Sequence, residues 1–296
     1  MEGDRKLMKF IQLSLLLIIC FVLVAESRAE TGEQMAAASA EKYPFFTMKD
    51  TAFSFEGEFI LPEGYRYLDS TELTPYQYWI SGFPLWHRYK PVGMWKGRKQ
   101  FEADEISRAV HLPWKGPSFR DVGFPIYIIS EYLRHLHQES NFTVIPHFGD
   151  TLDYPTWLHS KMTLSGTGAV RLIPVEQRDS SVYEYFKLLD VAMRHSTYKS
   201  LATNSDSISV DDIAPGDLLI GHDERGREGS VYFVLNMIVN DSGENLYCVA
   251  TGCPEACDFH IPLVNLDRDN PWIDTDRMFK LISDYPFYGV FRWRLP

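Results

Sequence analysis

Apolar residues recur at helical spacing through the first two thirds of the chain. Over residues 121–138 they return every three or four positions, which is typical of one face of an amphipathic helix. The same periodicity predicts helices over 76–84 and 182–194. A further helix is expected through residues 153–162, because Asp153 can cap it and the proline that follows is tolerated in a first turn.

The last third of the chain instead alternates short apolar runs with polar loops. We expect strands of one antiparallel sheet at residues 218–221, 231–239, 246–251, 259–264 and 288–293. An earlier strand is expected at 106–112. Helices followed by a meander are the α+β layout. The pattern therefore predicts a single α+β domain over residues 75–296, with N-terminal helices packed on a C-terminal antiparallel sheet, and a spacer and N-terminal extension over 30–74.

The first 29 residues have the pattern of a secretory signal peptide. Arg5, Lys6 and Lys9 precede an uncharged apolar run over residues 11–25, and Ser27-Arg28-Ala29 offers small residues for cleavage. The run is shorter than the roughly 20 residues that a membrane-spanning helix needs. We therefore expect a secreted or periplasmic protein with no stable membrane span after cleavage, the alternative being tethering by an uncleaved signal anchor.

Charge and composition narrow the class of partner. The chain carries a net charge of −11, which disfavours binding to nucleic acid through its phosphates. Hydrophobic residues make up 45% of the sequence, which indicates a packed core. No sequence pattern points to a cofactor.

Three cysteines remain once the signal, with its Cys20, is removed. Cys253 and Cys257 are separated by three residues, and an oxidising compartment favours a disulfide between them. The alternatives are two buried thiols that never meet, or a zinc site, for which these two cysteines and His260 supply at most three of four ligands. Asn141 and Asn240 each begin a glycosylation sequon.

Several short motifs, in order, resemble an uncharacterised bacterial family, the domain of unknown function numbered 4846. They are Tyr78-Trp79-Ile80, Phe83-Pro84-Leu85, Glu131-Tyr132-Leu133, Pro215-Gly216-Asp217 and Asp258-Phe259-His260-Ile261. The resemblance covers about residues 75–296. This family in turn resembles the papain-like, NlpC-type cell-wall amidases, which implies a papain-like layout for the fold.

In those amidases a cysteine opens a helix and a histidine begins a strand of the following sheet, so that the imidazole takes the proton of the thiol. By this resemblance the cysteine position falls on Asp121, or on Val122 if the loop gap lies later. Ser230 stands at the histidine position and Thr251 at a glutamine position. Replacing a nucleophile or base typically costs catalysis on the order of a millionfold.

The resemblance therefore implies a degenerate papain-like cleft with a non-catalytic role, either structural or in binding a peptide, a glycan or another partner. The alternative is a hydrolase of cell-wall peptides or other amides with a relocated site, for which Asp121, His222 and His260 are candidates. A third interpretation is that the likeness concerns the fold alone and says nothing about lost activity.

Overall fold

The computed structural model describes residue 43, residues 53–113 and residues 116–296. The predicted signal peptide, with Cys20, lies outside the described residues, as does about half of the predicted spacer and N-terminal extension. Within the described ranges, no helix has the length and apolar character needed to cross a membrane.

A six-stranded antiparallel sheet forms the centre of the molecule. Its longest strand, β11 (Gly229–Asn240), pairs with β10 (Leu218–His222), β12 (Asn245–Ala250) and β1 (Tyr65–Tyr67). The sheet continues from β10 to β14 (Phe287–Trp293) and then to β9 (Ser205–Ser207).

Eight further strands form four two-stranded sheets. They are β13 (His260–Pro262) with β4 (Ile106–Ala109), β2 (Val92–Gly93) with β3 (Lys99–Phe101), β5 (Thr143–Val144) with β6 (Leu152–Asp153), and β7 (Ser160–Leu164) with β8 (Val170–Pro174). The expectation that residues 259–264 join the main sheet is wrong. β13 pairs with β4, and a single bridge between Thr251 and His260 joins it to the end of β12.

Four helices lie close to where the hydrophobic pattern places them: α3 (Pro75–Ser81), α4 (Gly123–His135), α5 (Tyr154–Leu158) and α6 (Val182–Arg194). The structure adds three helices that the pattern did not predict, α2 (Phe55–Glu58), α7 (Tyr198–Thr203) and α8 (Thr275–Lys280), and the 3-10 turns η1 (Glu139–Asn141) and η2 (Val210–Asp212). Asp153 caps α5 by accepting a hydrogen bond from the Thr156 amide at 2.8 Å. α5 ends at Leu158, earlier than expected, because the chain turns into the β7–β8 hairpin.

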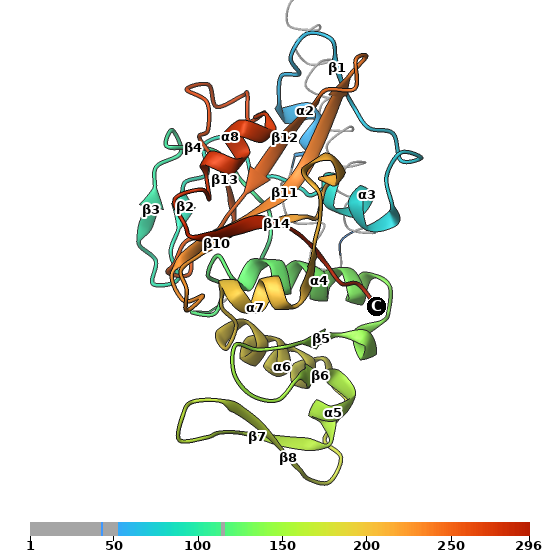
Figure 1. Cartoon of the computed structure of the whole chain (residues 1–296), viewed down its shortest axis with the longest axis vertical. Helices are drawn as coiled ribbons and strands as arrows, with labels where there is room; N and C mark the ends of the chain where they lie inside the picture. The colour runs from blue at the N-terminus through green and yellow to red at the C-terminus, as the bar shows by residue number, and fades with distance from the viewer. Residues whose placement is uncertain (1–42, 44–52, 114–115) are drawn as a thin grey trace, which may run out of the picture.

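The two faces of the main sheet carry separate cores. On one face, Phe124 of α4 packs against Phe259 and belongs to the same cluster as Val231 and Phe233 of β11. On the other face, Val234 clusters with Met278 of α8. Figure 1 shows α4 and α7 beneath the sheet, α6 beyond them and the β7–β8 hairpin at the far end.

The packed domain begins before residue 75. Phe55 and Phe59 are buried in the main core, and β1 is a strand of the main sheet. Tyr43 is also buried and donates a hydrogen bond to the Trp79 carbonyl at 2.8 Å. Part of the segment expected to be a spacer therefore belongs to the core.

The α+β prediction is confirmed, since the structure mixes helices with antiparallel sheets.

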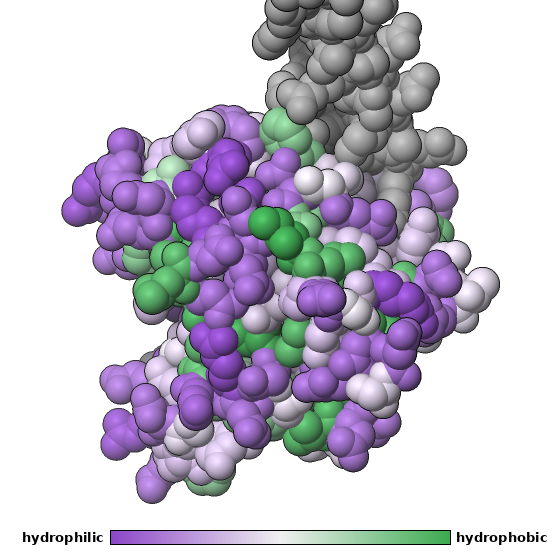
Figure 2. All heavy atoms as spheres, turned by 90° about the horizontal axis from the view of Figure 1, so that it is seen from above, coloured by the Kyte–Doolittle hydropathy of each residue, from purple (hydrophilic) through white to green (hydrophobic). Residues whose placement is uncertain are grey.

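The face seen in Figure 2 is mostly hydrophilic, with small separate hydrophobic areas.

Candidate functional site

Asp121 is a buried carboxylate just before α4. Its Oδ1 accepts a hydrogen bond from the Val122 amide at 2.8 Å, and its Oδ2 accepts one from the Tyr198 hydroxyl at 2.6 Å. The backbone amide of Asp121 donates to the carbonyl of Cys253 at 2.9 Å. The residue is therefore fixed between α4, the start of α7 and the loop after β12.

The surroundings of Asp121 decide its protonation. Burial raises the pKa of its carboxyl group, and the hydrogen bonds from Tyr198 and Val122 oppose this rise. Burial and the neighbouring Asp121 carboxylate raise the pKa of the Tyr198 phenol, which therefore stays protonated and donates. In the described part of the chain, neither hydrogen bond of this carboxylate comes from a histidine.

Ser230 and Thr251 are each hydrogen-bonded away from Asp121. The Ser230 hydroxyl lies 3.2 Å from the Tyr285 hydroxyl. Alternation along β11 turns Ser230 away from the face of Val231, which packs with α4. Thr251 donates to the Val231 carbonyl at 2.7 Å. The structure therefore does not direct these two hydroxyl groups at the Asp121 carboxylate.

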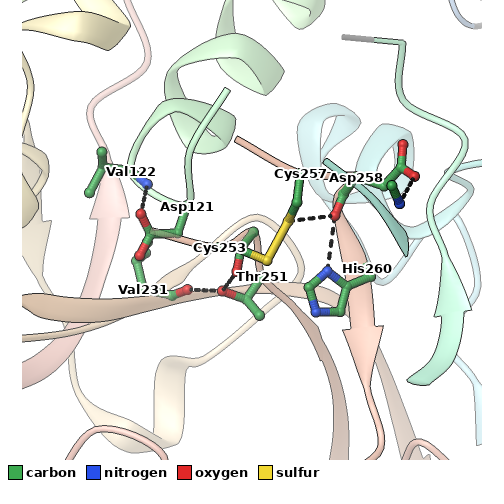
Figure 3. The surroundings of a disulfide bond; sticks show 10 residues. Asp121, Val122, Val231, Thr251, Cys253, Cys257, Asp258 and His260 are labelled. Atoms are coloured by element: carbon green, nitrogen blue, oxygen red, sulfur yellow. Dashed lines mark hydrogen bonds between the residues drawn. A yellow bond between two sulfur atoms is a disulfide. The ribbon is translucent and has the colours of Figure 1, made fainter. Parts of the chain in front are cut away.

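The two candidate histidines also lie apart from Asp121. The Nδ1 of His222 is 2.6 Å from the carbonyl of Asp223, and its ring stacks on Phe287. His260 is buried, with Nδ1 2.9 Å from the carbonyl of Asp258. Figure 3 shows His260 and Asp121 on opposite sides of the disulfide. Neither histidine forms the pair that the relocated hydrolase site requires.

Cys253 and Cys257 form a disulfide, with Cα atoms 5.9 Å apart, while Cys248 is a buried free thiol. The ligand atoms of Cys253, Cys257 and His260 lie within 4.8 Å of one another, as a metal site would require. Zinc binds thiolates, and the disulfide withdraws both sulfur atoms from that role. The same bond closes a tight loop against the backbone of Asp121.

A cavity of about 450 Å³ opens beside Asp121, and we call it the Asp121 cavity. The lining residues that bear charge or hydrogen-bonding groups include Arg120, Asp121, His147, Arg194, Tyr198 and Arg227. They come from the segment before α4, the loop after β5, the end of α6, the start of α7 and the turn between β10 and β11. A volume of this size can hold a small organic molecule or a short part of a peptide or glycan.

Sequence reasoning missed all the basic members of this lining. Arg120 adjoins Asp121, and this adjacency was the one signal available. His147, Arg194 and Arg227 lie far apart in sequence and belong to no motif. Only the fold brings them to one cavity.

The two sequons differ in the state of the asparagine. Asn141 is exposed at the end of η1. Asn240 is half-buried at the β11–β12 turn, where its Oδ1 accepts hydrogen bonds from the Ser242 and Glu244 amides.

The fold and this cavity define an α+β domain with a polar, partly enclosed site. The family model described as domain of unknown function (4846) matches residues 55–290. The chain therefore belongs to this family. Searches of curated proteins and of solved structures found no match.

Proposed function

We propose that the chain is an exported, non-catalytic member of its family, in which the Asp121 cavity binds a ligand such as a peptide or a glycan. The observation that carries the proposal is the state of Asp121. The residue at the cysteine position of the papain-like resemblance is a buried carboxylate held by Tyr198 and Val122, next to a cavity of about 450 Å³.

The loss of catalysis follows from the chemistry of these groups. A carboxylate that accepts two hydrogen bonds and has no partner imidazole lacks the activated thiolate of a papain-like amidase. Ser230 at the histidine position points its hydroxyl at Tyr285. The disulfide between Cys253 and Cys257 supports export, because such bonds persist in oxidising compartments.

A second candidate function is an amide hydrolase with its site elsewhere in the same cavity. Its support is the hydrogen bond of 2.9 Å between the Nδ1 of His147 and the hydroxyl of Thr197, a contact that resembles a base and its nucleophile. Against it, Thr197 caps α7 and takes part in a reciprocal capping box with Ser200. The Thr197 hydroxyl is therefore used to cap α7 rather than held free to act as a nucleophile.

The test of the proposal combines a steric block with a product search. Thr167 is exposed and lines the cavity, so Thr167→Trp narrows the cavity without changing its charge. The matched control is Thr71→Trp, at an exposed threonine outside the cavity lining. Peptides and glycans from a cell-wall digest are mixed with each protein, ultrafiltered and identified by mass spectrometry.

We expect the unmodified chain and Thr71→Trp to retain the same molecules at unchanged mass, and Thr167→Trp to retain none. Equal retention by all three proteins would refute binding in the cavity. Products of hydrolysis that disappear in Thr197→Val and His147→Gln would establish the second candidate instead.

A further inference from the structure

The Asp121 cavity is basic in a chain that is acidic overall. The net charge of the chain is −11. The lining of the cavity nevertheless contains three arginines, Arg120, Arg194 and Arg227, and two histidines. The one carboxylate in this lining is that of Asp121. An acidic protein that concentrates arginines in one concave place focuses a positive potential there.

Two of these arginines form no ion pair with a carboxylate in the described part of the chain. Arg194 pairs with Asp190, which also accepts a hydrogen bond from Ser118. Arg120 and Arg227, by contrast, have no carboxylate within 4.0 Å in the part of the chain that the structure describes. Their guanidinium groups are therefore available to a ligand.

His147, one of the two histidines of the lining, lies in the same positive field. The pKa of His147 is lowered, first by burial and then by the charges of Arg227 and Lys199. Its imidazole is therefore neutral at pH 7 and adds a neutral hydrogen-bonding group to the lining. The Thr197 hydroxyl, 2.9 Å from its Nδ1, orients the ring.

The basic lining continues past the disulfide loop. A second hollow of about 320 Å³ shares Arg120 and Pro254 with the Asp121 cavity and adds Lys96 and Arg98. It also contains Trp95, whose side chain is 47% exposed and offers an aromatic face. The only carboxylate among its lining residues is that of Glu255.

We propose that the Asp121 cavity binds an organic molecule through its oxoanion, a carboxylate or a phosphate group, held by Arg120 and Arg227. This inference rests on the proposed function and names the chemical class of its ligand. The planar guanidinium fork matches an oxoanion in two parallel hydrogen bonds. A cavity of about 450 Å³ exceeds the size of a single small ion, so the anionic group belongs to a larger molecule.

Isothermal titration calorimetry at low ionic strength tests the inference by measuring the binding of three anionic probes. Citrate supplies carboxylates, glucose 6-phosphate supplies an organic phosphate, and inorganic phosphate supplies the ion alone. Glucose is the neutral probe. We expect saturable binding of citrate or glucose 6-phosphate, weaker binding of inorganic phosphate and none of glucose; the stronger of the two organic probes identifies the anion.

Arginine variants locate the binding. Arg120→Ala and Arg227→Ala should each weaken the bound organic probe about 10- to 100-fold, as expected for loss of a hydrogen bond to a charged group. Arg225→Ala is the matched control, because Arg225 lies in the same turn as Arg227, is exposed and does not line the cavity. It should leave the affinity within about twofold of the unmodified chain.

Two results of the calorimetry would overturn the inference. One is the absence of saturable binding of all three anions; the other is equal weakening by Arg225→Ala and Arg227→Ala. The proposed function fails separately, through the steric variant. If neutral digest molecules are retained and Thr167→Trp releases them, the cavity binds ligands but the anionic class is wrong. If Thr167→Trp changes no retention, the cavity is not a binding site at all.

Discussion

The hydrogen bond from Tyr198 to Asp121 holds the centre of the candidate site together. The two oxygen atoms are 2.6 Å apart, and both residues are buried. Tyr198→Phe removes the donor and keeps the ring, which also packs in the main core. A hydrogen bond to a charged group contributes about 1.5–3 kcal/mol. We therefore expect the free energy of unfolding at pH 7 to fall by about 2 kcal/mol, which lowers Tm by about 4–8 °C.

The pH dependence of this change has a definite sign. Burial raises the pKa of Asp121 in the folded state, so its protonated form is favoured by folding. The stability that this group contributes is present below its unfolded pKa, and it is lost as pH rises through the raised folded pKa. Tyr198→Phe removes a hydrogen bond that lowers this pKa, so the loss extends to higher pH.

Urea denaturation followed by tryptophan fluorescence, at pH 7 and at several lower values, measures both effects. Tyr89→Phe is the matched control, because its side chain is 71% exposed. Asp121→Asn keeps an acceptor for the Val122 amide, offers the Tyr198 hydroxyl an NH2 donor in place of the carboxylate acceptor, and removes the charge, so it should abolish the pH-dependent part. A Tyr198→Phe variant whose free energy of unfolding stays within about 0.5 kcal/mol of the unmodified chain at every pH would mean that this hydrogen bond does not stabilise the fold.

Three further predictions concern the frame around the site. Asp217 is buried and takes two hydrogen bonds from Arg292, so Arg292→Met should cost about 3 kcal/mol in urea denaturation; a cost below 1 kcal/mol would show that water replaces the pair. Replacing Cys253 and Cys257 together by serine should lower the free energy of unfolding by about 2 kcal/mol, as expected for so short a loop, and an unchanged Tm would argue against the bond. Gly252→Ala adds a Cβ only 2.9 Å from the backbone that precedes α4, so we expect a loss of about 1–3 kcal/mol by thermal denaturation; full stability would mean that the loop moves freely.

The hydrophobic pattern predicted the helices better than the sheet pairing. A period of 3.6 residues is a local property, and α6 begins and ends at the predicted residues 182 and 194. Strand pairing depends on distant partners instead. β13 joins β4, about 150 residues earlier in the chain, and no local pattern near residue 260 indicates this. The β7–β8 hairpin was missed because Met162 of β7 was assigned to the helix that begins after Asp153, and this helix ends at Leu158.

The residues of the candidate site were likewise predicted only in part. Family resemblance drew attention to Asp121, and the structure shows it buried at the wall of a cavity. It also drew attention to Ser230, which faces Tyr285 instead. The basic residues of the cavity, among them Arg227 and His147, carry no motif. Their common function depends on four segments of the chain meeting in space.

We propose above that the Asp121 cavity binds a ligand without hydrolysing it. The most direct measurement is mass spectrometry of the molecules retained from a cell-wall digest after prolonged incubation, with the unmodified chain and Thr167→Trp side by side. We expect the unmodified chain to return its ligand at unchanged mass and Thr167→Trp to retain none. Recovery of fragments that have gained the mass of one water, formed by the unmodified chain and absent with Thr167→Trp, would contradict it.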